Sequence, residues 1–477
     1  MKEETCACAP ARNFSGKQLL GFGLGIASLV ILFLAPESAN LSHEALTSIG
    51  VLLCCVFMWF FGSMSTGVVG VLGCFLLFIL GVQPTFQSAF SGFTTTTAWF
   101  ILAVYCMTAY MQYSTLGLRL TKRFILWAGA DSRKLVLAIM VVTALCSAFM
   151  TDTGAVALSL SFSVPLLKLV GAKKDNSNLG KCLMIGICIA ACIGGFTTPC
   201  GHSLNVLSLG LLQTQLGISV GFLTWMAYGV PCAIVVLPVA WACLVKVFPP
   251  ENVRQEQIDA ILKDQFGTGG FTKVDAKCLV MMILLPVLWI AGNWVPFLNA
   301  TVVSIFGMLM LFVPGMGILK WKEFEGLVSW NLFLFFGGVL SIGAAITATG
   351  AADFMASAFL NSGITNLPVL AALLLIGAVL YLLHTVCPTA PAWCAILLPP
   401  LFTYATTVVI SPFVPAFMIV SLMAGSYLVP LCPAMSMTYD HGYYKFGEMA
   451  RSGVISSIVL VAVVVLWSFL LGGVLVI

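Results

Sequence analysis

The chain has 477 residues, of which 60% are hydrophobic and only 8% are charged, and its formal net charge is +4. Soluble domains carry about 25% charged residues, so this composition excludes a soluble globular protein and indicates an integral membrane protein. The basic residues are spread over several loops, which argues against a nucleic-acid-binding surface. Apolar runs long enough to cross a bilayer recur along the chain and lack the alternation of a membrane β-barrel. We therefore predict an all-α polytopic membrane protein.

The membrane segments can be placed in chain order, because Lys and Arg mark cytoplasmic loops. Connections such as "PESANLSHE" and "GNWVPFLNA" contain neither residue, so they are expected on the opposite side. About eleven transmembrane helices result, near residues 18–35, 44–61, 66–82, 98–113, 182–212, 220–246, 277–294, 300–314, 330–349, 413–437 and 453–476. This topology predicts a multi-pass protein of the cell (inner) membrane, with its N-terminus cytoplasmic and its C-terminus extracytoplasmic.

Two further segments are expected to be re-entrant hairpins. Residues 135–171 start and end on the basic side, and each arm is short for a complete crossing. Residues 366–410 start and end on the uncharged side, so this hairpin has the opposite orientation. The two tips read "TDTGA" and "CPTAP". Irregular backbone at membrane depth persists only where protein or a water-filled cavity satisfies it, so both tips are expected to face a cavity.

The two halves of the chain resemble each other. Trp99 in "TTTTAWFILAVY" corresponds to Trp330 in "GLVSWNLFLFFG", and a hairpin follows each. Next comes a helix broken by Gly and Pro, at "GGFTTPCGHS" within 182–212 and at "GSYLVPLCPAMS" within 413–437. Paired broken helices in two inverted repeats are the best sequence indication of a transporter's midplane site. Their N-terminal amides suit an anion, and their C-terminal carbonyls suit a cation.

These observations divide the chain into four parts. We expect an N-terminal tail with the first transmembrane helix (1–43), a first inverted repeat (44–247), a cytoplasmic linker (248–276) and a second inverted repeat (277–477). Most of the 17 Cys lie in apolar spans and are expected to be packing residues. Cys6 and Cys8 in the tail have no partner at metal-ligand spacing, so no metal site is expected there.

Asp152 is the one acidic residue that falls in the interior of a predicted membrane segment. An Asp at the centre of a membrane helix costs about 2.5–3.5 kcal/mol, so such a residue is functional by default. Three roles remain open. Asp152 could bind Na⁺ together with Ser147 and Thr151, carry a proton, or cap the second helix of the hairpin. His202 and His384 flank the two tips, and either could hydrogen-bond a carboxylate, carry a proton or be structural.

The repeats, the hydroxyl-bearing tips and "DHGYYKFGEMARSG" near the C-terminus together resemble the divalent anion/sodium symporter family. The resemblance covers nearly the whole chain after the first span. It implies a homodimer in which each subunit has a scaffold domain and a transport domain that slides like an elevator. The scaffold would be mostly residues 1–113 and 277–350, and the transport domain residues 135–246 and 366–477. The amphipathic segment 116–131 would link them.

The same resemblance implies a Na⁺ site at each tip and a carboxylate or sulfate substrate between the tips. The Na⁺ sites would use Ser147, Thr151, Asp152 and Thr197 in the first half and Thr385, Pro388, Ala390 and Leu431 in the second. The substrate site would use Thr151, Asp152, Thr153, Thr198, Pro199, Cys387, Pro388, Thr389, Cys432 and Pro433. Family tips normally read Ser-Asn-Thr, whereas these read Thr-Asp-Thr and Cys-Pro-Thr. Pro388 supplies no side-chain oxygen, so the cation chemistry is expected to concentrate at Asp152.

We therefore predict a Na⁺-coupled symporter of small organic anions, most simply di- or tricarboxylates, that works by an elevator mechanism. Its coupling ions would be Na⁺ or protons, with no organic cofactor, and its partners would be the anion, the bilayer and a second copy of the chain, without nucleic acid. The alternatives are a Na⁺/H⁺-type antiporter, an anion exchanger and a proton-coupled transporter that uses Asp152. An enzyme is not expected, since intramembrane aspartyl proteolysis needs two facing Asp and only Asp152 is embedded.

Overall fold

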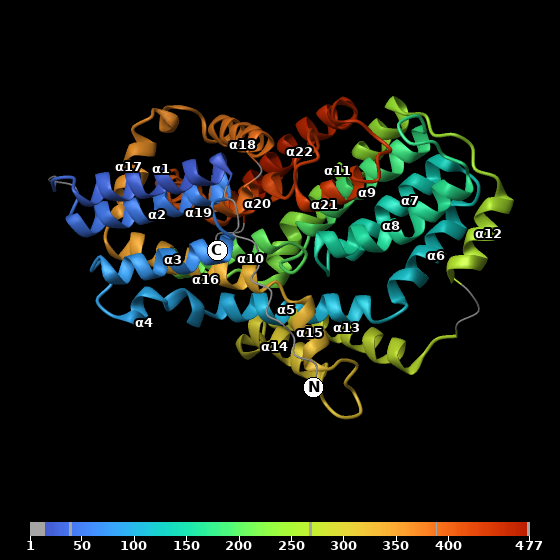
Figure 1. Cartoon of the computed structure of the whole chain (residues 1–477), viewed down its shortest axis with the longest axis horizontal. Coiled ribbons are helices and arrows are strands. Elements are labelled where there is room, and N and C mark those ends of the chain that lie inside the picture. The colour runs from blue at the N-terminus through green and yellow to red at the C-terminus, as the bar shows by residue number, and fades with distance from the viewer. Residues whose placement is uncertain (1–14, 38–40, 267–269, 388, 475–477) are drawn as a thin grey trace, which may run out of the picture.

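The computed structural model describes residues 15–37, 41–266, 270–387 and 389–474. In this part of the chain the secondary structure elements are 22 α-helices and three short 3₁₀-helices (Figure 1). Eight of these helices are long and apolar enough to cross a membrane, judged by length and composition. The prediction of an all-α polytopic membrane protein is therefore confirmed. Cys6 and Cys8 lie outside the described residues.

The helices of the first half follow the predicted order, with additional short ones. They are α1 (Gly16–Phe33), α2 (His43–Phe61), α3 (Thr66–Ile79), α4 (Phe86–Ala89), the 3₁₀-helix Ser91–Thr94, α5 (Thr96–Gln112), α6 (Leu116–Ala128), α7 (Ser132–Ser147), α8 (Asp152–Leu169), α9 (Asn178–Gly195), α10 (Ser203–Leu216), α11 (Phe222–Val247) and α12 (Gln255–Phe266). Hydroxyl side chains start many of them: Thr95, for example, accepts a hydrogen bond from the Ala98 N–H at 3.2 Å.

The second half repeats this order. It contains α13 (Lys273–Ala291), the 3₁₀-helix Pro296–Leu298, α14 (Ala300–Met310), α15 (Trp321–Leu327), α16 (Trp330–Ala348), α17 (Ala351–Leu360), the 3₁₀-helix Ile364–Asn366, α18 (Val369–Val386), α19 (Ala390–Thr407), α20 (Phe413–Met423), α21 (Pro433–Tyr439) and α22 (Phe446–Val474). The predicted hairpins are the pairs α7–α8 and α18–α19. The predicted broken helices are the pairs α9–α10 and α20–α21.

The packing of the broken helices is reciprocal between the halves. Beyond the first break, α10 packs against α19 and α20, which belong to the second half. Beyond the second break, α21 packs against α8 and α9, which belong to the first. Two more helix pairs join the two halves: α5 of the first half packs against α14 of the second, and α3 of the first packs against α16 of the second. Each half therefore completes the surroundings of the other half's hairpin.

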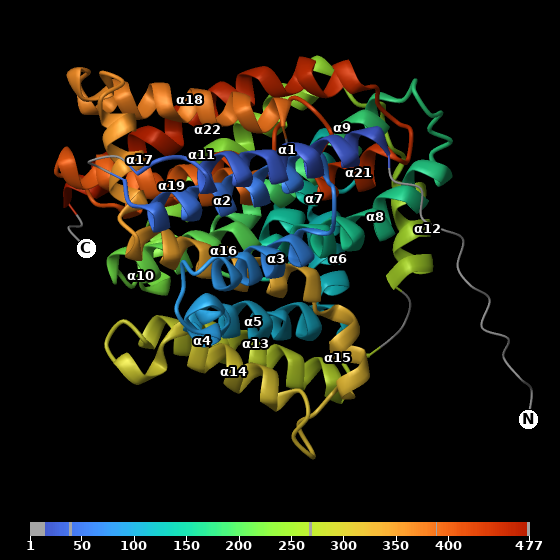
Figure 2. The ribbon, with the colours of Figure 1, turned by 60° about the vertical axis from the view of Figure 1, so that its left-hand side comes forward.

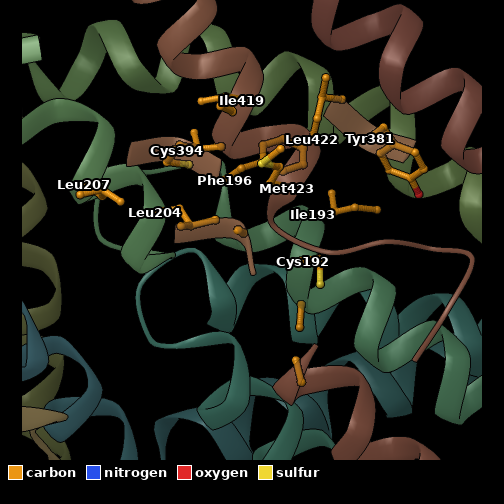
Figure 3. Close-up of a cluster of buried hydrophobic side chains, with 14 of the residues drawn as sticks. Cys192, Ile193, Phe196, Leu204, Leu207, Tyr381, Cys394, Ile419, Leu422 and Met423 are labelled. Carbon is orange, nitrogen blue, oxygen red and sulfur yellow. The ribbon is translucent and has the colours of Figure 1, made fainter. Parts of the chain in front are cut away.

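The breaks are embedded in a densely packed core. Figure 3 shows a cluster of buried apolar side chains from several helices, among them Ile193 of α9, Phe196 directly after it, Leu204 of α10 and Ile419 of α20. Of the α9 residues, 94% are buried. A Cβ added at Gly194 of α9 would lie 2.1 Å from a backbone oxygen of α7, so only glycine permits this approach. Such packing fixes the positions of the helix ends that border the breaks.

The outer helices carry apolar stripes that face away from the core. On α13, Val280, Ile283 and Val287 are all more than half exposed and follow a helical spacing. In Figures 1 and 2, α13 and α14 lie at the bottom of the molecule, whereas α18 and α22 lie at the top. Exposed apolar stripes on long helices are what contact with lipid requires.

The expected linker, 248–276, contains a helix that the sequence analysis did not predict. In α12, Ile258, Ile261 and Leu262 are buried, and the helix packs against α6 and α8. These three residues lie at the i, i+3 and i+4 spacing of an amphipathic helix. The linker is thus attached to the first half through one apolar face.

Candidate functional site

A cavity of about 490 Å³ lies where the two hairpins and the two breaks meet. Its walls also include α5 and the start of α16. The first hairpin contributes Thr151, Asp152 and Thr153, the first break Cys200, Gly201, His202, Ser203 and Leu204, the second hairpin His384, Ala390 and Pro391, and the second break Met423, Ala424, Cys432, Pro433 and Ala434. No Lys or Arg is among the described residues that line it. An anion in this cavity must therefore be held by hydroxyls, N–H groups, helix dipoles or a bound cation.

Several helices start at the cavity. The residues before α8, α10 and α19 are Thr151, His202 and Thr389, and the short helix α21 follows Cys432. Helix N-termini carry a partial positive charge and free N–H groups, which favour anions. The preceding helices α7, α9, α18 and α20 end in the same region, and the partial negative charge of a helix C-terminus favours cations. The arrangement therefore offers ligands for both signs of charge.

Asp152 supplies the carboxyl group of the first hairpin tip. The residue is only 9% exposed and lines the cavity wall. The Ser147 hydroxyl lies 2.7 Å from Asp152 Oδ1, and His202 Nε2 lies 3.2 Å from Asp152 Oδ2. His202 Nδ1 accepts the Leu204 N–H at 3.0 Å, so in the neutral ring Nε2 carries the proton, on the side that approaches Asp152. On the inner side, a Cβ added at Gly195 would lie 2.4 Å from Asp152 Oδ1, so only glycine fits there.

The backbone of the first break is held by side-chain hydrogen bonds. Asn205, which is completely buried, donates to the carbonyl oxygens of Gly195 at 2.8 Å and Thr198 at 2.7 Å. The Thr198 hydroxyl donates to the Ala148 carbonyl oxygen in the turn of the hairpin. The break and the hairpin tip are therefore tied together. Asn205 was not predicted from the sequence, where its signal is an amide between the apolar residues Leu204 and Val206.

Hydroxyl groups join the second hairpin to its neighbouring helices. Thr385 and Ser426 hydroxyls lie 2.8 Å apart and join the hairpin to the second break. The Tyr381 hydroxyl lies 2.6 Å from the Ser457 hydroxyl and accepts the Tyr427 N–H at 2.8 Å. Pro388, predicted for both sites, lies outside the described residues. Among the described residues, the two tips therefore differ by one carboxyl group.

The structure distributes the predicted site residues over three positions. Six of them line the cavity: Thr151, Asp152, Thr153, Ala390, Cys432 and Pro433. Three that could supply oxygen ligands lie behind this wall, in contact with the tips or breaks: Ser147, Thr197 and Thr385. The others border the tips or breaks without being part of the wall: Thr198, Pro199, Cys387, Thr389 and Leu431.

Other polar residues of the wall were not identified from the sequence. Thr108 and Tyr105 on α5, Ser203 on α10 and Ser329 before α16 all line the cavity. They could not be distinguished beforehand from structural polar residues of a helix interface. Among the described residues, no three His, Cys, Asp or Glu side chains gather as a metal cluster. A cation here would therefore rely on hydroxyl and carbonyl oxygens besides Asp152, a ligand set that suits Na⁺ better than a transition metal.

Two hairpins and two broken helices that converge on a polar cavity, inside a protein with apolar outer helices, define a membrane transporter of the secondary type. The sequence profile of the sodium:sulfate symporter transmembrane region matches residues 17–477. The chain therefore belongs to the sodium:sulfate symporter family, and the resemblance stated from the sequence is confirmed.

Curated relatives match over nearly their whole length. The sodium-dependent dicarboxylate transporter SdcS of Staphylococcus saprophyticus is 23% identical, over 95% of this chain and 91% of the relative. SdcS of Staphylococcus aureus strain USA300 is 24% identical, over 95% of this chain and 92% of the relative. Among solved structures, the Alcanivorax borkumensis YdaH transporter superposes with a TM-score of 0.58 at 15% identity, covering 91% of this chain and 98% of that one. The likeness to YdaH shows a shared fold.

Proposed function

We propose that this protein is a Na⁺-coupled symporter of small organic anions, with di- or tricarboxylates as the substrates. The observation that carries the proposal is the cavity itself, where helix N-termini meet beside the buried Asp152 and where the described wall residues include no Lys or Arg. The sodium-dependent dicarboxylate transporters of two staphylococci, which match almost end to end, support the same coupling ion and substrate class.

The first Na⁺ would bind at Asp152. Ser147 Oγ lies 2.7 Å from the Asp152 carboxyl group and 2.8 Å from the Ala191 carbonyl oxygen. Thr151 precedes Asp152 at the tip, and Thr197 belongs to the first break, where its hydroxyl donates to the Gly194 carbonyl oxygen. Hard cations such as Na⁺ prefer oxygen ligands of this kind. The end of α9 also directs carbonyl groups into this region, and the partial negative charge there favours a cation.

The second Na⁺ would bind at the other tip with weaker ligands. Thr385 is joined there to Ser426, and we propose Ala390 and the Leu431 region as further ligands. The described residues provide no carboxylate at this tip. We propose that the coupling is therefore asymmetric and depends mainly on Asp152.

The anion would bind between the tips, against the starts of α8 and α10 and the hydroxyls of Thr151 and Thr153. An ionised Asp152 at the wall repels such an anion, and a bound Na⁺ removes this repulsion. Binding of one ligand therefore raises the affinity for the other, which is thermodynamic coupling between the two. Residues 135–246 and 366–477 would then carry both ligands across the membrane as one transport domain, in a homodimer held by the scaffold helices.

Uptake by proteoliposomes tests the proposal. The purified protein is reconstituted, and uptake of labelled succinate is measured with an inward Na⁺ gradient and with K⁺ in its place. We expect uptake above equilibrium only with the Na⁺ gradient. Sodium–proton exchange in the absence of any organic anion would contradict the proposal in favour of an antiporter. Succinate uptake that follows a proton gradient and ignores Na⁺ would assign the coupling to protons instead.

A further inference from the structure

His384 is a buried residue of the cavity wall whose hydrogen-bonding groups are unused. It lies in the last turn of α18 and is only 2% exposed. Neither of its ring nitrogens has a hydrogen-bond partner among the described residues. The neighbouring Tyr381 and Thr385 on the same helix are both hydrogen-bonded. The lack of partners is therefore specific to this imidazole and does not reflect a loosely packed helix end.

A buried imidazole without partners is unfavourable, because it has lost its hydrogen bonds to water and gained none. Buried polar side chains in native proteins almost always find a partner, in the protein, in ordered water or in a ligand. His384 lines the cavity, although both ring nitrogens are buried, so a rotation of the imidazole ring toward a molecule bound in the cavity would supply that partner. The position of the residue thus indicates a ligand contact.

The second imidazole of the wall cannot serve the same purpose. His202 uses Nδ1 to accept the Leu204 N–H and directs Nε2 toward Asp152. Since the described wall contains no Lys or Arg, His384 is its one nitrogen-bearing side chain that keeps a donor for a substrate. It stands in the second half, beside the start of α19 at Ala390, whereas the Asp152 site belongs to the first half.

We propose that His384 binds the second carboxylate of a dicarboxylate substrate and so makes the site select dicarboxylates over monocarboxylates. This inference rests on the proposed function. One carboxylate lies at the first half, near the Na⁺ at Asp152 and the starts of α8 and α10. The other accepts the His384 N–H and lies at the positive end of α19. The remaining ring nitrogen is left for a water molecule. His384 is therefore a specificity-determining residue.

The test compares two ligands that differ by one carboxylate, succinate and butyrate. Their dissociation constants are measured in Na⁺ by calorimetry with the full-length protein, using competition against succinate for the weaker ligand. Wild type is expected to bind succinate at least about tenfold more tightly than butyrate, because one hydrogen bond to a charged group contributes about that factor. His384→Leu should lose most of this preference while its affinity for butyrate stays the same. His384→Gln, which keeps an N–H donor, should retain part of it.

His441→Leu is the matched control, because His441 lies after α21 and does not line the cavity; it should behave as wild type. If the ratio of the dissociation constants of butyrate and succinate is the same in His384→Leu as in wild type, the assignment is overturned. An equal loss of affinity for both ligands would leave this ratio unchanged and would overturn it too. If His384→Leu does not fold, the ratio in His384→Gln decides in the same way. Wild type that binds neither ligand would contradict the proposed function itself, and the assignment with it.

Discussion

Replacing Asp152 by Asn separates the charge of this residue from its shape. The amide is nearly isosteric with the carboxyl group and can satisfy the same neighbours. Its oxygen can accept the His202 Nε2–H, and its NH₂ group can donate to the Ser147 hydroxyl, which in turn donates to the Ala191 carbonyl oxygen. Because every hydrogen bond keeps a partner, we expect Asp152→Asn to change the free energy of unfolding by less than about 1 kcal/mol.

The effect on Na⁺ binding should be much larger. Two opposite unit charges about 4 Å apart attract by about 4 kcal/mol at an effective dielectric constant of 20. Part of this energy offsets the lost hydration of the ion and of the carboxylate. We therefore expect a net loss of about 1.4–2.8 kcal/mol, which corresponds to Na⁺ affinity about 10- to 100-fold weaker. The maximal uptake rate in saturating Na⁺ should fall much less.

The assay is succinate uptake by proteoliposomes as a function of external Na⁺, together with thermal unfolding of the purified variant. Asp353→Asn provides the control, because Asp353 is exposed on α17 and does not line the cavity. We expect a higher half-saturating Na⁺ concentration only in Asp152→Asn. If Asp152→Asn keeps the Na⁺ and pH dependence of wild type, the role of Asp152 is structural and the reasoning is refuted.

Three further substitutions test the stability of the first break and of α7, which packs against it. Asn205→Ala leaves two carbonyls of the first break without a donor, so it should lower stability by about 2–3 kcal/mol in thermal unfolding; a wild-type melting curve would contradict this. Gly194→Ala should cost about 1–3 kcal/mol through its clash with α7, whereas Gly23→Ala, which meets nothing within 4 Å, should not destabilise. The pKa of Asp131 is lowered by hydrogen bonds from backbone N–H groups at the start of α7. The stabilisation of α7 by this cap is therefore fully present above the usual pKa of Asp, and it is lost as the pH falls through the lowered pKa of Asp131. Asp131→Ala should therefore destabilise by about 1 kcal/mol at pH 7 and progressively less in acid, and an equal loss at pH 7 and pH 3 would refute the cap.

Much of the fold was predictable from local signals. Gly and Pro mark both breaks, and the hydroxyl and acidic residues at Thr151 and Asp152 mark the first tip. The start of α8 follows from the same residues, since Thr151 accepts the Gly154 N–H as an N-cap. Charge placement and apolar length indicated where the long helices lie.

What could not be predicted depends on contacts between segments far apart in the sequence. Asn205 became part of the site because its amide reaches two carbonyls across the break. His202 was expected beside the site, but its contact with Asp152 depends on how α10 starts. Tyr105 reaches the cavity only because α5 lies along it. None of these placements has a periodic signal, because each is set by tertiary packing.

The central claim is that Na⁺ and a dicarboxylate bind in one cavity and assist each other. The most direct measurement is the dissociation constant of succinate for the purified protein over a range of Na⁺ concentrations, and that of Na⁺ with and without succinate. Linkage requires both affinities to rise by the same factor, and we expect at least about fivefold in wild type and much less in Asp152→Asn. Succinate affinity that is the same in Na⁺ and in K⁺ would contradict the account.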